Sequence, residues 1–442
     1  MTTFALATTI ALLPVLVPRG PGNTSPTDLF AAAFLLLGLL ALAQRGRRLR
    51  VPAPGAIALI LVGSIVALAL STHPRVGLLT LLADTYLLVL IIMIANHLSG
   101  TQAERLLRLL LIVWTVAALV WATVLLAGYL DLLPRGVVHL LEIRADSQRG
   151  AGVSRNNPNL AGGYMVTSFF VLLASPWPRS RPPRLLAAGW LLWALFATGS
   201  LGALLGLVAG CAAWALGVYL RSGRSAREVQ GLAGVALVLG TLGLAGLVMA
   251  AGIPRFGLAE VDTVSQEAKG GVLDNSVGRA GKSFAGRLGL WSEGVARAGP
   301  RVIVGVGPGE AKYELQISNG TINRETGALS TRSIHSDVLG FLIERGIVGL
   351  CGLLLLYAAL LRRAWRVLVV GRHRRIGVAA LGAAVVANAA HSLFHETFHF
   401  RHTIVLIGLL WVAAELAASS PEPTATPATV AAPEELDAVA RS

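Results

Sequence analysis

Polar residues suited to proton transfer and anion binding lie at the start of one long apolar segment. Residues 331–350 read TRSIHSDVLGFLIERGIVGL, and the chain then stays apolar through Tyr357. Ionisable groups beside a bilayer are costly, so they usually have a function there. Histidine changes its charge near neutral pH and can move a proton. His335 is therefore a candidate, although a lone histidine at a helix start more often has only a structural role.

The expected position of His335 favours its neutral form. If Ser333 caps the helix, His335 lies in the first turn, where the positive end of the helix dipole disfavours imidazolium. Asp337 would then lie about 200° around the helix and could not orient the imidazole. We therefore expect a partner from another segment, either Glu396 or another residue of the loop 391–402.

The composition is that of a membrane protein with many spans. Of the 442 residues, 55% are hydrophobic and 14% are charged, whereas soluble domains have about 45–50% apolar and about 25% charged residues. A helix crosses the hydrocarbon core with about 20 apolar residues. We predict an all-α polytopic fold with about twelve spans, at residues 3–18, 28–44, 55–71, 76–96, 106–128, 158–176, 185–199, 202–220, 231–252, 338–361, 376–393 and 403–418.

The net charge of +14 reflects membrane topology rather than nucleic-acid binding, because the arginines lie in alternate loops between the predicted spans. Basic loops stay on the cytoplasmic side. This rule places both termini inside and the segments 129–157, 253–337 and 391–402 outside. The predicted domains are residues 1–252 with nine spans, the external loop 253–337, residues 338–418 with three spans, and the tail 419–442, which we expect to be disordered.

Two segments in the external loops hold groups able to bind anions. SRNNPNLAGGY at 154–164 places Arg155 near Pro158, which can open a helix whose free amides attract anions. A plain helix cap is the equally weighted alternative. SFAGRLGLWSEGVARAGP at 283–300 has the apolar spacing of a helix and is expected to lie along the membrane surface.

The motifs do not favour a nucleotide or metal site. GRAGKS at 278–283 lacks the glycine that a P-loop has five residues before its Gly-Lys-Ser, and we expect no metal at EVD, 260–262. His395, His399 and His402 would share a helical face, but their spacing makes no convincing tetrahedral set. We favour a histidine-rich turn at the membrane interface and expect neither metal nor cofactor.

Several motifs follow one another in a characteristic order. They are SRNNPNLAGG, ATGSLGALLGLVAG at 197–210, GRLGLWSEGV followed by VGVGPGE, and IHSDVLGFLIERGIVGL. Over roughly residues 150–415, this order resembles the O-antigen ligase and polymerase family of bacterial envelope glycan assembly. The strongest match is carried by His335, Glu344, Gly346, Gly349 and Leu350. The chain departs from the family at Leu201, where Ser-Arg-Gly is common.

The resemblance implies a membrane glycosyltransferase of the GT-C type whose donor is a glycan on undecaprenyl diphosphate. The acceptor would be a sugar hydroxyl of lipid A-core or a comparable glycolipid at the outer face of the plasma membrane. His335 would be the general base. Arg287, Arg155 and Arg332, in descending order of expectation, would hold the diphosphate, because guanidinium groups match phosphate oxygens.

Other functions stay open at this point. A polysaccharide polymerase of the same family would share the donor, the base and the fold but extend the glycan on its carrier lipid. A secondary transporter has a matching number of spans, yet transporters usually keep ionisable residues near the midplane, where this chain has mainly Asp84. A non-catalytic scaffold or flippase partner is a further alternative.

Overall fold

The computed structural model describes residues 1–17, 24–46, 49–141, 150, 152–154, 157–221, 287–315, 318–322, 329–331, 333–369 and 377–419. Within these residues the protein is almost entirely helical, as predicted. The helices are α1 (Thr2–Ala11), α2 (Pro26–Arg45), α3 (Pro54–Ala69), α4 (Pro74–His97), α5 (Ala103–Tyr129), α6 (Arg135–Leu140), α7 (Pro158–Ala174), α8 (Arg181–Thr198), α9 (Leu201–Arg221), α12 (Ala311–Glu314), α13 (Asp337–Val369), α14 (Val378–Ser392) and α15 (Arg401–Ala418). A further helix covers 287–298, and two short antiparallel strands, β1 (Ser318–Ile322) and β2 (Leu329–Thr331), follow it.

Eleven of the twelve predicted spans overlap helices of the described residues, and the span predicted at 231–252 lies outside them. Six helices are long and apolar enough to cross a membrane, and α1, α3, α7 and α14 are shorter apolar helices. The protein is therefore a helical membrane protein. The count of twelve spans, the GT-C assignment, the domain boundaries and the orientation of the termini stay predictions.

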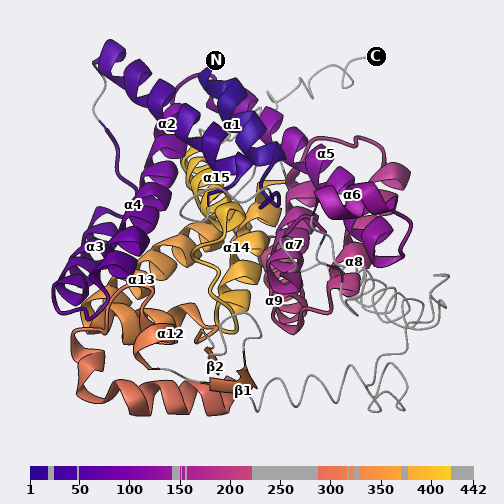
Figure 1. Ribbon diagram of the computed structural model, residues 1–442. Helices are drawn as coiled ribbons and strands as arrows, with labels where there is room; N and C mark the ends of the chain where they lie inside the picture. Colours follow the sequence, from indigo (N-terminus) through magenta and orange to yellow (C-terminus); the bar gives the residue numbers. More distant parts are fainter. Residues whose placement is uncertain are drawn as a thin grey trace, which may run out of the picture.

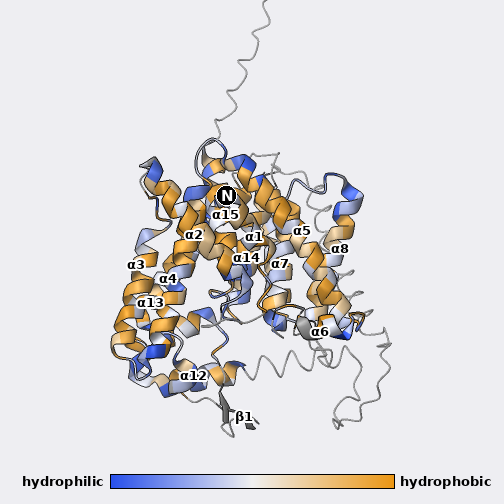
Figure 2. Cartoon of the chain, turned by 45° about the horizontal axis from the view of Figure 1, so that its top comes forward, coloured by the Kyte–Doolittle hydropathy of each residue, from blue (hydrophilic) through white to orange (hydrophobic). Residues whose placement is uncertain are grey.

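Hydrophobic residues cover the sides of the helical bundle, and hydrophilic residues gather toward its two ends (Figure 2). Large apolar side chains such as Leu36, Leu79 and Leu186 are exposed on this surface. A surface of this kind is suited to lipid, because the helices satisfy their own backbone hydrogen bonds and present apolar side chains outward.

The centre of the bundle consists of α7, α14 and α15, with α3, α4 and α13 on one side and α5 and α8 on the other (Figure 1). In α15, every residue from His402 to Ala414 is buried. Some polar groups inside this core are paired where the helices meet. For example, the indole Nε1 of Trp114 donates to the hydroxyl of Ser168 at 2.9 Å.

Glycines allow α13 to pack closely on α3. A Cβ added to Gly63 would lie 2.4 Å from the backbone nitrogen of Gly349, and one added to Gly352 would lie 2.6 Å from that of Ile60. Small residues permit such close approach between helices in membranes. The Gly-Leu step of the strongest motif therefore has a packing role.

Helix α13 is interrupted at Gly346, where φ is 67° and ψ is −171°. The break leaves two carbonyl groups of the preceding turn for another segment. The amide of Val306 donates to the carbonyl of Ile343 at 2.9 Å, and the amide of Gly307 donates to that of Glu344 at 3.1 Å. The Glu-Arg-Gly step thus joins α13 to the VGVGPGE loop.

Replacing Gly346 by alanine is expected to destabilise the protein by several kcal/mol. Left-handed backbone costs about 1–3 kcal/mol for a residue with a side chain, and the added Cβ would lie 2.5 Å from the carbonyl oxygen of Ile303. Gly340→Ala is the matched control, since no atom lies within 4 Å of its added Cβ. A thiol-reactive dye that detects unfolding through Cys211 measures both variants in a protein that carries Cys351→Ser, because Cys351 is exposed in the folded state. Equal unfolding temperatures would contradict the role of the kink.

The VGVGPGE loop bends tightly, as its glycines predict, with positive φ at Gly305, Gly307 and Gly309. Its final residue, Glu310, is fully buried. The Glu310 carboxylate accepts hydrogen bonds from the Ser71 hydroxyl at 2.5 Å and from the His73 amide at 3.1 Å. The loop is therefore fixed to the α3–α4 connection as well as to α13. Residues 253–286 and 420–442, which belong to the predicted external loop and tail, lie outside the described residues.

Candidate active site

Helix α13 begins later than predicted. Ser336 is its N-cap, because the Ser336 carbonyl accepts from the Gly340 amide at 2.8 Å and its hydroxyl lies 3.5 Å from the Leu339 amide. The expectation that Ser333 caps the helix is therefore wrong, and His335 lies before the first turn rather than in it. Ser336 directly precedes the first helical residue, so its hydroxyl can reach a first-turn amide that has no partner within the helix, as N-cap side chains do.

His335 has a left-handed backbone, with φ of 54°, which is uncommon for residues other than glycine. Its amide donates to Oε1 of Glu396 at 3.2 Å, and its Nδ1 lies 3.3 Å from the Ser333 hydroxyl. The 391–402 loop does supply neighbours, as expected, but Glu396 binds the backbone rather than the imidazole. Strained residues held by their surroundings are frequent at functional sites.

Three histidine rings follow one another from His335 into the bundle. The ring of His395 lies 5.3 Å from that of His335 and 5.7 Å from that of His391. Nδ1 of His395 accepts from the Glu396 amide at 3.0 Å, so a neutral His395 carries its hydrogen on Nε2.

His395, His399 and His402 do not share a helical face, contrary to expectation, because α14 ends at Ser392 and α15 begins only at Arg401. His399 instead bonds Asp84, whereas the ring of His402 packs on that of Tyr164. In the part of the chain that the structure describes, no three histidine, cysteine or acidic side chains are placed to bind one metal ion.

Arg287 lies at the start of helix 287–298, which is docked beside His335. The indole Nε1 of Trp291 donates to the Ile334 carbonyl at 2.9 Å, and its ring lies 6.1 Å from that of Phe394. Arg287 is one turn before Trp291 and so lies on the same side of the helix. Its guanidinium is near enough to His391 to interact electrostatically. The structure thus brings Arg287 close to the rings of His335, His395 and His391, which will be called the histidine row.

The Arg287 guanidinium is partly buried, and its Nη1 has no hydrogen-bond partner among the residues that the structure describes. Burial lowers the pKa of Arg287. Buried polar groups are normally paired with protein, water or an ion. On the same helix Leu288 and Val295 are exposed, while Leu290 and Ala298 are buried, which fits the predicted position along the membrane surface.

Glycines of two other motifs enclose the ring of His391. A Cβ added to Gly163 would lie 2.9 Å from its Cε1, and one added to Gly202 would lie 2.8 Å from its Cδ2. His391 is fully buried, and within the described part of the chain neither of its ring nitrogens has a hydrogen-bond partner. Gly163 and Gly202 therefore leave the space that the His391 imidazole occupies. Gly202 directly follows Leu201 in the chain.

Replacing Gly202 by alanine is expected to displace His391, because its Cβ would collide with the ring. Overpacking of this kind costs about 1–3 kcal/mol, and we expect a lower transfer rate as well. Gly189→Ala is the control, since its added Cβ meets no atom within 4 Å and alanine is favoured over glycine in a helix. Unfolding temperature and initial rate are compared for both. A Gly202→Ala protein as stable and active as Gly189→Ala would contradict the expected collision.

The segment SRNNPNLAGGY forms a plain helix cap, which was the alternative to an anion site. Pro158 begins α7, and Oδ1 of Asn157 accepts from the amides of Asn159 and Leu160, both at 3.1 Å. Two first-turn amides are thereby occupied. Arg155 and Arg332 lie outside the described residues, so their roles stay predictions.

A cavity of about 320 Å³ lies beside His335. Ser333 and Ser336, which flank His335, both line it. The other lining residues are Gly309, Ala311, Lys312, Asp337, Gly340, Phe341, Glu344, Arg345, Glu396 and His399. This cavity will be called the carboxylate cavity, after Asp337, Glu344 and Glu396.

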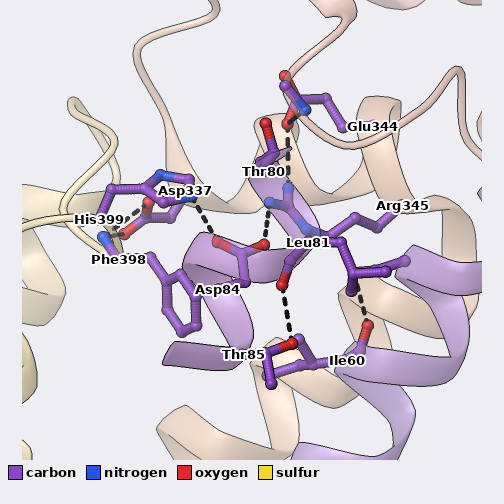
Figure 3. A network of polar contacts seen from close by, with 12 residues as sticks. Ile60, Thr80, Leu81, Asp84, Thr85, Asp337, Glu344, Arg345, Phe398 and His399 are labelled. Atoms are coloured by element: carbon purple, nitrogen blue, oxygen red, sulfur yellow. Dashed lines mark hydrogen bonds and ion pairs between the residues drawn. The ribbon is translucent and has the colours of Figure 1, made fainter. Parts of the chain in front are cut away.

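Three residues of the cavity wall, Glu344, Arg345 and His399, belong to an ionic network with Asp84 (Figure 3). Asp84 accepts from Arg345 at 2.5 Å and contacts His399 at 2.8 Å through its second oxygen. Arg345 also contacts Glu344 at 3.0 Å. Desolvation would lower the pKa of His399, but the Asp84 carboxylate outweighs it and raises the pKa. One feature of the sequence indicated this network, namely the acidic residue inside a predicted span.

These features define a class, namely helical membrane proteins with ionisable side chains gathered where several helices and an inserted loop meet. Residues 186–354 match the family model described as O-Antigen ligase. The match contains most of α8, all of α9, helix 287–298, the VGVGPGE loop and His335, and it supports the family named from the motifs. No curated protein matches the chain. The matched domain supports a membrane enzyme of O-antigen ligase or polymerase type that processes glycans.

Proposed function

We propose that the protein moves a glycan from undecaprenyl diphosphate to a sugar hydroxyl of an acceptor glycolipid, lipid A-core or similar, at the outer face of the plasma membrane. The observation that supports it most is the position of Arg287, whose unpartnered Nη1 is buried close to the histidine row that begins at His335. A base and a phosphate ligand are the two groups that this reaction requires.

In the proposed reaction, His335 takes the proton of the acceptor hydroxyl. The hydroxyl oxygen forms a bond to C1 of the donor sugar as the bond from C1 to the phosphate oxygen breaks. Undecaprenyl diphosphate leaves with the bonding electron pair. A positioned base contributes about 10²–10⁴-fold to such a step.

Arg287 is the proposed ligand of the diphosphate. Fixed donors aimed at developing negative charge are usually the largest catalytic contribution, and the leaving diphosphate carries that charge. The family often has an arginine at the position of Leu201, so more of this task falls on Arg287. Arg155 and Arg332 are proposed as further ligands. No metal or cofactor is required in this scheme.

Replacing Arg287 by glutamine is expected to lower kcat/KM by about 10²–10³-fold, the usual effect of removing one donor to a developing anion. Purified protein is incubated with synthetic undecaprenyl-diphosphate glycan and candidate acceptors. Arg301→Gln, at an exposed arginine of the same region, is the control. Unchanged turnover of Arg287→Gln would remove this residue from the diphosphate site, and a chelator that abolishes wild-type turnover would contradict metal independence.

The same assay separates the alternatives. Extension of the glycan on its own carrier lipid indicates a polymerase, while transfer to a different glycolipid indicates a ligase. A transporter is disfavoured, because Asp84 is paired with Arg345 and His399 and is not free to bind a coupling ion.

A further inference from the structure

The carboxylate cavity reaches His335 from the side of its backbone. Ser333 and Ser336 line it, and so does Glu396, whose Oε1 accepts from the His335 amide. The ring of His335, by contrast, points toward His395 and the rest of the histidine row, where Arg287 lies. A molecule bound in the cavity would therefore lie beside the proposed base without occupying the place of the proposed phosphate ligand.

Most of the acidic groups in this cavity are already satisfied. The Asp337 carboxylate accepts from Tyr357, Thr397 and the Phe398 amide. Glu344 accepts from the Gly309 amide and from Arg345. These carboxylates are therefore fixed parts of the wall.

Glu396 differs from them, because its carboxyl group has a single hydrogen bond, from the His335 amide, among the described residues. Burial and repulsion from Glu344 raise the pKa of Glu396 to about 7. Near neutral pH its carboxyl group can therefore both donate and accept a hydrogen bond. A sugar hydroxyl, which also does both, is a matching partner.

The positive charges of the cavity are mostly neutralised. Arg345 is paired with Asp84 and Glu344, and His399 is paired with Asp84. Lys312 is exposed and stands over the ring of Tyr313. A phosphate placed here would meet several carboxyl groups and one open cation, whereas Arg287 offers an unpartnered guanidinium nitrogen elsewhere.

We propose that the carboxylate cavity is the acceptor subsite and that it holds an uncharged sugar ring, with hydroxyls bound by Glu396 and Lys312. The volume of about 320 Å³ is at the small end for ligand pockets and suits a single sugar residue. This assignment rests on the proposed function, because it gives the second substrate of that transfer a place beside His335.

Binding of simple sugars tests the subsite without any turnover. Saturation-transfer NMR is recorded on the protein in nanodiscs with glucose, galactose, N-acetylglucosamine and glucose 6-phosphate. The uncharged sugars should receive saturation, and glucose 6-phosphate should receive several-fold less. Glu396→Ala and Lys312→Met should each reduce the signal, while Glu293→Gln, at an exposed acid paired with Arg297, should not. Equal signals in all four proteins, or stronger binding of the phosphorylated sugar, would overturn the subsite.

The kinetic form of the test distinguishes this subsite from the proposed function. Glu396→Gln keeps an acceptor for the His335 amide but removes the carboxyl group that binds the sugar hydroxyl, so KM for the acceptor should rise about tenfold. KM for the lipid donor should stay within about twofold. Lys312→Met repeats the test at an exposed residue. If the wild-type protein transfers the glycan and neither variant changes KM for the acceptor, the proposed subsite is wrong but the proposed function stands. If the wild-type protein transfers no glycan, the proposed function is wrong. The sugar-binding result then decides the subsite alone.

Discussion

His335→Asn should lose about 10²–10⁴-fold in transfer rate, the contribution of a positioned general base. Asparagine is one of the residues that tolerate the left-handed conformation seen at this position, where φ is 54°. The fold should therefore be preserved while the proton acceptor is removed. Initial rates with synthetic lipid-linked glycan and an acceptor measure the effect, and the unfolding temperature checks the fold.

A second histidine provides the control for this substitution. His73 is exposed and is fixed by a hydrogen bond from its backbone amide to Glu310, so His73→Asn should keep most of the activity. His335→Gly is a useful second variant, because glycine relieves the backbone strain at this position. This variant should be at least as stable as the wild-type protein and as inactive as His335→Asn. If His335→Asn retains wild-type turnover, His335 is not the base.

Arg345→Met should destabilise the protein by about 3–5 kcal/mol, the usual result of removing one partner of a buried ion pair. The side chains of Arg345 and Asp84 are 1% and 0% exposed, so neither charge has water as an alternative partner. Asp84 would keep only His399. The unfolding temperature of detergent-solubilised protein, followed with the thiol-reactive dye, measures the loss.

The double variant Asp84→Asn with Arg345→Met isolates the pair. It removes both charges, so it should be more stable than Arg345→Met alone, since most of the cost is the charge left unpaired. Arg108→Gln, which breaks an exposed pair with Glu104, should change stability by less than about 1 kcal/mol. A double variant that is as unstable as the sum of its single variants would show that the two residues do not act as a pair.

The helices were predictable because their signals are local. Apolar runs of sufficient length mark α4, α5 and α13, and Pro158 after Asn157 marks the start of α7 within one residue. Helix 287–298 was also predictable, since its apolar spacing is helical. Such features depend only on neighbouring residues, which a single sequence contains.

The arrangement around His335 was only partly predictable, because it depends on contacts between distant segments. Nothing near Ser336 in the sequence says that it, rather than Ser333, caps α13. The break at Gly346 depends on the amides of the VGVGPGE loop, and the pairing of Asp84 with Arg345 joins residues 261 positions apart. The sequence shows His391 only as part of the segment 391–402. It does not show that Gly163 and Gly202, from two other motifs, leave the space for the His391 ring.

The most direct measurement is an electron cryomicroscopy structure of the protein with undecaprenyl diphosphate. We expect the diphosphate within hydrogen-bond distance of the Arg287 guanidinium, with the His335 imidazole facing the position that C1 of the donor sugar would occupy. A diphosphate bound away from Arg287, or a lipid carrier that enters from the face opposite His335, would contradict the proposed transfer reaction.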